Sequence, residues 1–314
     1  MIVDCVIINY RSAACVEKLL ASFRSSFTCL RSITIVDNAS RDDSIARIQK
    51  QILELGMERR VLITDAGRNG GFGSGNNFGA KQFQNFPQKP DVFWLLNPDT
   101  LVHQTDLQPA LDWYQSDPRV GIVGTGMVDG QGKPDLAGHR DPSPIGEFVK
   151  NAGAFGLLRR WSVSDPLLDR PGPVDWVSGA SLLIRRSAFD EIGGFDEGFF
   201  LYFEEVDLCR RAREAGWKVI YEPRSKIVHL EGKATGIAKA KPMPRYWYES
   251  RRRLFVKHYG VLGLWAADLA WAVGRTVGIL RGRGPSSCRW RDLIRCDLKV
   301  LLGREKLNLN HVRG

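Results

Sequence analysis

The sequence has little cysteine and no cysteine motif. Its six cysteines among 314 residues show no Cys-x-x-Cys spacing, which argues against a zinc site or a disulfide framework. Cys5, Cys15 and Cys209 lie in apolar patterns typical of buried thiols, so we expect a reducing, cytoplasmic location. The chain starts almost at once with an apolar strand pattern, without a basic leader and apolar segment before it, so we expect no secretory signal.

The sequence also lacks the two common phosphate-binding glycine motifs. Residues 67–79 contain six glycines, but they have neither the Gly-Lys-Ser/Thr end of a Walker loop nor a Gly-x-Gly-x-x-Gly spacing. The backbone amides of such a run at a helix start still suit a phosphate or a closely approaching sugar. A mobile linker is the alternative, disfavoured because Asn69, Asn76 and Asn77 add hydrogen-bond donors.

Acidic residues are scarce in the last part of the chain. Residues 233–314 carry 18 Lys and Arg against 5 Asp and Glu, whereas the net charge of the whole chain is +10, so the excess positive charge lies in the tail. The hydrophobic content of 43% and the charged content of 25% are typical of a globular protein. We predict a catalytic domain, residues 1–244, followed by a basic helical extension, residues 245–314.

The tail contains an apolar run, residues 261–280, about long enough to span a bilayer. Asp268 and Arg275 interrupt it seven residues apart, on one helical face, which favours a helix lying in the membrane interface. We therefore predict peripheral attachment to the inner face of the cytoplasmic membrane. The alternative is a soluble helical hairpin packed on the catalytic domain or on a homodimer partner. Nucleic-acid binding is less favoured, because no recognition motif accompanies the charge.

Strand and helix patterns alternate four times within the first hundred residues. Buried strand patterns cover residues 3–9, 32–37, 60–64 and 92–96, with helical patterns between them. This alternation predicts an α/β protein with a Rossmann-like, doubly wound, mostly parallel sheet. Ser40 and Asp43 have the spacing of a capping box for the second helix. Residues 125–175 are rich in Gly, Pro and Asp without periodicity, which predicts a long loop or lid.

Asn97 and Asp99 directly follow the buried strand at residues 92–96, which Pro98 cannot continue. The carboxyl ends of strands in open α/β sheets are where ligands bind. Two oxygen-bearing side chains there can present hard ligands to Mg²⁺ or Mn²⁺ held on a diphosphate. The alternative is a simple proline turn. His229, at the end of an apolar strand, could complete the coordination, although a lone histidine is more often a core or surface residue.

Carboxylates follow two other predicted elements. Asp37 lies past the second strand, where it could accept a hydrogen bond from N3–H of a uracil or thymine ring; a helix-entry turn is the alternative. Glu204, Glu205 and Asp207 open a helix after the apolar residues 199–203. The helix dipole favours negative charge at that position. Partial desolvation would raise the pKa of at least one of these carboxylates and suit it to general-base catalysis.

The order of these motifs along the chain is recognisable. The motifs are Asp37-Asn38-Ala39-Ser40, Asn69-Gly70-Gly71-Phe72-Gly73, Asn76-Asn77, Asn97-Pro98-Asp99, Ser178-Gly179-Ala180, Phe203-Glu204-Glu205-Val206-Asp207-Leu208-Cys209 and Val228-His229. The series resembles the family 2 inverting glycosyltransferases of GT-A fold. Within that family it is most similar to bacterial rhamnosyltransferases that act on lipid-linked or polysaccharide acceptors. The resemblance covers roughly residues 1–257.

This resemblance implies a role for each motif residue. The residues that would bind the nucleotide sugar are Asn9, Asp37, Asn69, Gly70, Asn76, Asn97 and Asp99. The acceptor would contact Ser178, Gly179 and Glu204. A divalent cation, Mg²⁺ or Mn²⁺, would bind Asp99 and His229, with Asn97 beside them, and Glu205 would be the general base assisted by Glu204. Residues 1–124 would then form the nucleotide-sugar-binding half and residues 125–244 the acceptor half.

The chain departs from the family pattern at two of these positions. Asn97 replaces the first Asp of the Asp-x-Asp motif, which removes one charge from the metal site, and Glu205 replaces the commoner Asp. We expect transfer of a sugar, L-rhamnose from dTDP-L-rhamnose, to a lipid-linked or polysaccharide acceptor with inversion. The alternatives are a nucleotidyltransferase of similar architecture, although residues 9–12 supply no basic glycine-rich activation loop, and a catalytically inactive glycan-binding or scaffold protein.

Overall fold

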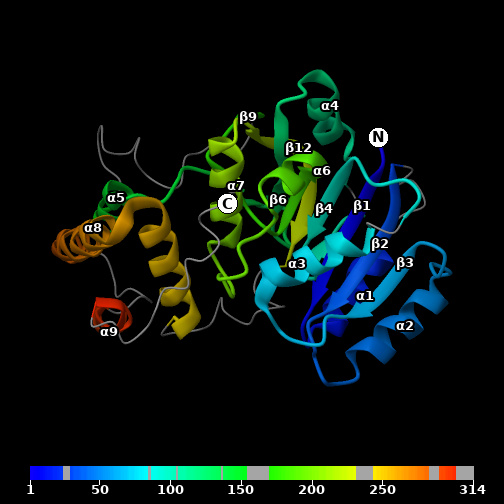
Figure 1. Cartoon of the computed structure of the whole chain (residues 1–314), viewed down its shortest axis with the longest axis horizontal. Helices are drawn as coiled ribbons and strands as arrows, with labels where there is room; N and C mark the ends of the chain where they lie inside the picture. The colour runs from blue at the N-terminus through cyan, green and yellow to red at the C-terminus, as the bar shows by residue number, and fades with distance from the viewer. Residues whose placement is uncertain are drawn as a thin grey trace.

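The computed structural model describes residues 1–23, 29–83, 86–103, 105–135, 137–153, 170–230, 243–282 and 290–301. Its centre is one large mixed sheet with the strand order β3-β2-β1-β4-β11-β6-β12-β5, with β7 beside β6 and β9 beside β12 (Figure 1). The strands are β1 (Val3–Asn9), β2 (Leu30–Asp37), β3 (Val61–Asp65), β4 (Val92–Leu96), β5 (Thr100–Leu101), β6 (Val120–Val128), β7 (Pro134–Asp135), β9 (Gly172–Pro173), β11 (Ser181–Arg185) and β12 (Lys218–His229).

The first four strands of this order are parallel, as the sequence predicts. β11 is antiparallel to both β4 and β6, whereas β12 runs parallel to β6. The predicted α/β class is therefore confirmed, with an antiparallel strand in the middle of the sheet. A separate two-stranded ribbon pairs β8 (Gly138–His139) with β10 (Trp176–Val177).

Helices cover both faces of the sheet, and the alternation of side chains along β1 explains why. Val3, Cys5 and Ile7 pack in the core cluster that also holds apolar residues of α1 (Ala13–Ser22), α2 (Ser44–Glu54) and α4 (Gln108–Ser116). Val6 and Ile8 point the other way, into the cluster formed with α3 (Gly71–Gln82), α6 (Arg186–Glu191) and α7 (Glu204–Glu214). β1 is thus apolar on both faces because both faces are covered.

The glycine run forms most of helix α3 and is not a loop that precedes a helix. A Cβ atom at position 79 would lie 2.5 Å from Cγ1 of Val6, and one at position 75 would lie 2.8 Å from Oδ1 of Asn38. Gly71 has a φ of +89°, and a Cβ there would meet the carbonyl of Phe200. The glycines therefore let α3 lie directly on β1 and β2, and this packing outweighs their low helix propensity.

The predicted loop at residues 125–175 is wrong in part. β6 continues to Val128, and the short strands β7 and β8 follow it. Helix α5 (Pro144–Ala152) begins where the Ser143 hydroxyl accepts a hydrogen bond from the Gly146 amide. Residues 154–169 lie outside the described part of the chain.

The tail forms helix α8 (Arg245–Leu280), which is interrupted at Gly260 with a φ of +70°, and helix α9 (Trp290–Leu301). α8 packs against α5 and α9, away from the main sheet (Figure 1). Asp268 does not mark a polar solvent face, because its carboxylate accepts a hydrogen bond from the buried Arg251 at 2.7 Å. Among the described helices, none is long and apolar enough to cross a membrane.

Candidate active site

The carboxyl ends of β1 and β2 hold Asn9 and Asp37 side by side, as their pairing in the parallel register requires. Asp37 is almost fully buried and accepts hydrogen bonds from Asn9 Nδ2 at 2.6 Å and from the Ser40 amide and hydroxyl at 2.8 and 2.6 Å. The predicted capping box is wrong, because the Ser40 hydroxyl donates to Asp37 and does not cap α2. These contacts fix the Asp37 carboxylate at the carboxyl ends of β1 and β2, the edge of an open α/β sheet at which ligands bind.

The next strand end brings the first and second halves of the chain together. The Asn97 amide donates to the carbonyl of Ala180 at 2.9 Å, just past the pairing of β4 with β11. This contact places the segment Ser178-Gly179-Ala180 against the Asn97-Pro98-Asp99 turn. The Ser178 hydroxyl accepts from the Ala180 amide at 3.2 Å, which holds the small-residue bend in shape.

Asp99 and His229 lie together where β12 ends. His229 Nε2 is 3.5 Å from Oδ1 of Asp99, and the Leu230 amide donates to the Asp99 carbonyl at 2.9 Å. Nδ1 of His229 is buried and has no hydrogen-bond partner within the described residues. Over the described ranges, no group of three or more His, Cys, Asp and Glu side chains is arranged to hold a metal ion. The pair would therefore supply two ligands, and a donor diphosphate would have to supply the others.

Helix α7 begins with the pair of glutamates. Glu204 is buried, whereas Glu205 is partly exposed and its Cβ lies beside Gly179, 3.6 Å from the position that a Cβ would take there. Burial raises the pKa of both carboxyls above the usual range, and the neighbouring Glu205 raises that of Glu204 further. Tyr202 and Phe203, just before the helix, have φ values of 72° and 68°. Such strained backbone is concentrated at functional sites.

The three predicted residues of the glycine-rich segment lie in different surroundings. Asn69 is partly exposed and its side chain accepts from the Gly71 amide at 3.1 Å, and Gly70 is the residue before α3. Asn76 is fully buried and donates to the Phe72 carbonyl at 3.0 Å. Their roles in binding the nucleotide sugar stay predictions.

Neighbouring contacts thus join most of the predicted site residues along one edge of the sheet. Asp37 contacts Asn9 on β1, β1 pairs with β4 before Asn97, and the segment beside Asn97 leads through Gly179 to Glu205. β12 runs parallel to β6, so its end at His229 lies at the same edge as the ends of β1 and β4. This edge therefore carries the buried carboxylate of Asp37, the Asp99–His229 pair and the two glutamates with raised pKa, and their roles in binding and catalysis stay predictions.

A profile of the family described as "Glycosyltransferase like family 2" matches residues 1–252. The chain belongs to this family. The predicted resemblance is confirmed, and the enzyme is a glycosyltransferase.

Two relatives in this family carry the name rhamnosyltransferase. The chain is 28% identical over 305 residues to the N-acetylglucosaminyl-diphospho-decaprenol L-rhamnosyltransferase of Mycobacterium tuberculosis, covering 94% of this chain and 93% of that protein. It is also 27% identical over 164 residues to rhamnosyltransferase WbbL of Escherichia coli K12, covering 51% of this chain and 60% of that protein.

Solved structures of other glycosyltransferases share the fold of this one. The mannosyltransferase PcManGT from Pyrobaculum calidifontis, in complex with GDP-Man and Mn²⁺, matches 96% of this chain and 88% of its own with a TM-score of 0.53 and 16% identity. GalNAc-T7, with UDP, GalNAc and Mn²⁺, matches 82% of this chain and half of its own length, also with a TM-score of 0.53, at 15% identity. These similarities confirm a GT-A-like fold for the glycosyltransferase.

Sequence reasoning missed one set of residues near Glu205, the predicted general base. Asp207 is fully buried and contacts Lys257 and His258 of α8, at 2.7 and 2.8 Å. The predicted domain boundary after residue 244 assigns those two side chains to a separate extension, and that boundary stays a prediction. The available signal was the spacing of Arg253, Lys257 and His258, which places three basic side chains on one helical face.

Proposed function

We propose that this glycosyltransferase moves L-rhamnose from dTDP-L-rhamnose to a lipid-linked glycan acceptor, with inversion at the anomeric carbon. The observation that carries the reaction type is the pair Glu204 and Glu205, with raised pKa, beside Gly179 at the edge of the sheet that also holds Asp37. The choice of sugar and of acceptor rests on the Mycobacterium tuberculosis relative. The name of that protein specifies both, and the similarity to it extends over nearly the whole chain.

In this proposal, Glu205 removes the proton from the acceptor hydroxyl as its oxygen attacks the anomeric carbon from the side opposite the leaving dTDP. The bond to the diphosphate oxygen breaks in the same step, so the configuration inverts through an oxocarbenium-like transition state. The raised pKa suits a base that must hold a proton near neutral pH. Glu204 lies beside it and would orient the acceptor, together with Ser178 and Gly179. Asp37 would accept a hydrogen bond from the thymine ring.

Asp99 and His229, with Asn97 beside them, fit a divalent cation. The supporting observation is the distance of 3.5 Å between His229 Nε2 and Oδ1 of Asp99, which is short enough for both atoms to bind one cation. Oxygen and imidazole ligands suit Mn²⁺ or Mg²⁺. When bound, such an ion neutralises the charge of the leaving diphosphate. Because Asn97 brings no charge, we expect weaker binding of the metal than at a site with two aspartates.

We also propose that the second half of α8 attaches the enzyme to the anionic inner face of the cytoplasmic membrane. The outward face of this helix is apolar: Leu262, Leu269 and Leu280 are 85%, 67% and 82% exposed, and Trp265 lies between the first two. An exposed apolar face of this extent marks an interaction surface. The surrounding tail has an excess of Lys and Arg, which complements anionic lipids.

The reaction is tested with the Glu205→Gln variant. We expect turnover with dTDP-L-rhamnose and a polyprenyl-diphosphate-linked acceptor sugar, in the presence of Mn²⁺, to fall by a factor of about 100 or more, because the amide cannot accept the proton. Donor affinity, measured by calorimetry, should change little. Turnover close to that of the parent enzyme would overturn the role of Glu205. Binding of the acceptor without any transfer by the parent enzyme would favour a glycan-binding protein.

Membrane attachment is tested with Trp265→Ser combined with Leu269→Ser. We expect this variant to lose most of its sedimentation with anionic vesicles, whereas Leu53→Ser, at an equally exposed leucine on α2, should sediment like the parent protein. Equal sedimentation of both variants would contradict attachment through α8. Deleting the whole tail is a poorer experiment, because α8 also supplies buried partners of the catalytic domain.

A further inference from the structure

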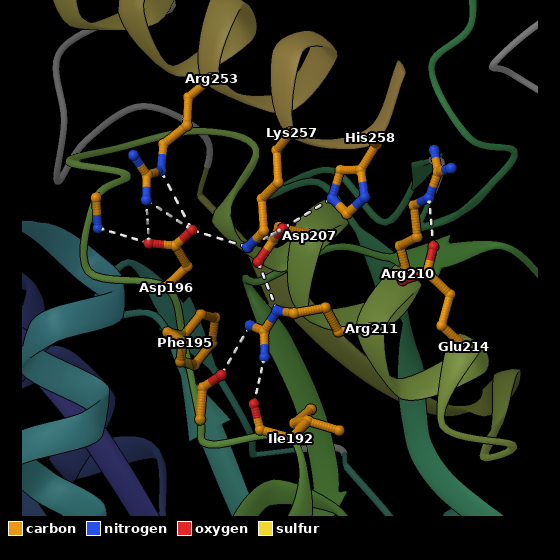
Figure 2. Close-up of polar contacts among 12 residues, drawn as sticks. Ile192, Phe195, Asp196, Asp207, Arg210, Arg211, Glu214, Arg253, Lys257 and His258 are labelled. Atoms are coloured by element: carbon orange, nitrogen blue, oxygen red, sulfur yellow. Dashed lines mark hydrogen bonds and ion pairs between the residues drawn. The ribbon is translucent and has the colours of Figure 1, made fainter. Parts of the chain in front are cut away.

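The first half of α8 contacts α7 through charged side chains that are buried (Figure 2). Oδ1 of Asp207 lies 2.7 Å from Lys257 Nζ and 2.8 Å from His258 Nε2, and Oδ2 accepts from Arg211 Nε at 2.8 Å. Asp207 is fully buried, and the side chains of Lys257 and His258 are 8% and 6% exposed. Burial favours the neutral acid, but these cationic and hydrogen-bonding neighbours outweigh it and lower the pKa of Asp207.

Lys257 joins Asp207 to a second carboxylate. Its Nζ lies 2.8 Å from Oδ2 of Asp196, which also accepts from Arg253 Nη2 at 2.9 Å, while Oδ1 of Asp196 lies 2.7 Å from the same nitrogen. Figure 2 shows Arg253, Lys257 and His258 descending from one face of α8 onto the two acids. One lysine is thus shared between the segment before α7 and α7 itself.

The segment around Asp196 also forms hydrogen bonds with side chains of α7 and α3. Arg211 donates to the carbonyls of Ile192 and Gly194 at 2.6 and 2.7 Å. Asn77 of α3 donates to the Phe195 carbonyl at 2.9 Å and accepts from the Phe195 amide at 2.8 Å. Helices from the nucleotide-sugar half, the acceptor half and the tail therefore meet at residues 192–196.

The start of α7 has little local support of its own. Within the described chain, no side chain caps it, and the residue at the cap position, Phe203, has a left-handed backbone conformation. Three carboxylates, Glu204, Glu205 and Asp207, share the first turn and repel one another when ionised. Lys257 and His258 of α8 contact Asp207 and hold this turn from outside α7.

We propose that Lys257 and His258 are positioning residues for the transfer reaction: by holding Asp207, they fix the first turn of α7 and with it the general base Glu205. The proposal rests on the proposed function of Glu205. It makes α8 a part of the catalytic machinery, although neither residue touches the substrate.

The test compares two substitutions of His258 with one substitution of its neighbour Lys257 on α8. His258→Gln keeps a side-chain N–H for Asp207, His258→Leu does not, and Lys257→Met removes the shared cation. Glu214→Gln is the control, because it removes the exposed pair of Glu214 with Arg210 at the far end of α7. All variants are assayed well below their unfolding temperatures, with the folded fraction checked by circular dichroism.

We expect His258→Leu and Lys257→Met to lower kcat by about tenfold or more, because an error of about 1 Å in the position of a reacting group is costly. KM for the donor should stay within a factor of two, and His258→Gln and Glu214→Gln should keep most of the parent kcat. The result that overturns the proposal is a lowered Tm with an unchanged kcat per folded molecule in both variants, which is what a purely structural role gives.

Two further results separate this proposal from the proposed function. If Glu205→Gln abolishes transfer while Lys257→Met and His258→Leu leave kcat unchanged, the base assignment stands and the positioning role is refuted. If Glu205→Gln retains normal turnover, the base assignment fails and the positioning role fails with it. A donor KM that rises in parallel with the loss of kcat would also refute positioning of the base, because it would show a general distortion of the site.

Discussion

Glu204→Gln should make the protein more stable at pH 8, although it removes a residue of the proposed site. The side chain is 3% exposed, and its Oε2 has no hydrogen-bond partner in the described residues. An unsatisfied buried acceptor costs about 1–3 kcal/mol, and the cost is higher when it is charged. The dipole of α7 returns only about 0.3–1 kcal/mol. The cost of burying the ionised carboxylate therefore exceeds the stabilisation by the helix dipole, which agrees with the raised pKa of Glu204.

The expected gain is about 1.4 kcal/mol in the free energy of unfolding, the difference between the midpoints of those two ranges. In a thermal scan of a chain of 314 residues this corresponds to a rise in Tm of about 2 °C. The sign depends on pH. Because the folded-state pKa is raised above the ordinary value of 4.5, the acid form stabilises the fold at low pH, and that stability is lost as pH rises through the folded-state pKa. The gain from Gln should therefore shrink towards zero as the pH falls to 4.5.

The control is Asp207→Asn, two positions further along the same helix. The pKa of Asp207 is lowered by its partners, so its contribution to stability persists at every pH above its ordinary value of 3.8. Removing the charge takes one carboxylate away from the largely buried cluster of Lys257 and Arg211, and should cost about 3–5 kcal/mol from pH 5 to pH 8. Differential scanning calorimetry at several pH values measures both variants. A gain for Glu204→Gln that is equal at pH 5 and pH 8 would refute the desolvation argument.

Four other outcomes are expected. Asp37→Asn should weaken dTDP binding in calorimetry by about 10- to 100-fold, since it replaces the charged acceptor proposed for the N–H of the thymine ring with a neutral amide; unchanged affinity would exclude that contact. His229→Ala should raise the Mn²⁺ concentration for half-maximal activity by about tenfold or more, and an identical metal titration would remove His229 from the site. Gly79→Ala should cost about 1–3 kcal/mol in chemical unfolding, because its Cβ would lie 2.5 Å from Val6; wild-type stability would mean that α3 shifts freely. The rate constant kcat/KM should fall on acidification through a pKa above 4.5, because burial raises the pKa of Glu205; a plateau down to pH 4.5 would contradict this assignment.

The parallel part of the sheet, and the edge at which its strands end, could be predicted because the sequence patterns that indicate them are local. Continuous apolar runs identify β1, β2 and β4, and parallel strands must bring their carboxyl ends to one edge. Asp37 and Asn97 therefore had to lie near that edge once the strand assignment was right. Asp99 follows the end of β4 and His229 lies at the end of β12, so both were expected at the edge where they contact each other.

The features that could not be predicted depend on contacts between distant segments. The glycines in residues 71–79 do not favour a helix, because the advantage of glycine there is a close approach to Val6 and Asn38 that no local pattern records. The Ser40 hydroxyl could either cap α2 or donate a hydrogen bond to the buried Asp37 carboxylate, and in the structure it donates to Asp37. Two partners of Asp207, Lys257 and His258, follow it by some fifty positions, so no local window of sequence joins them to Asp207.

The interruption of α8 at Gly260 suggests where tails could be exchanged between related enzymes. The family profile ends at residue 252, before Lys257 and His258, so a chimera joined at that boundary would bring in foreign partners for Asp207. A junction placed after Gly260 would keep the parent's own contacts and replace only the outer half of the helix. Hybrids of the second kind are the ones we expect to purify as working enzymes.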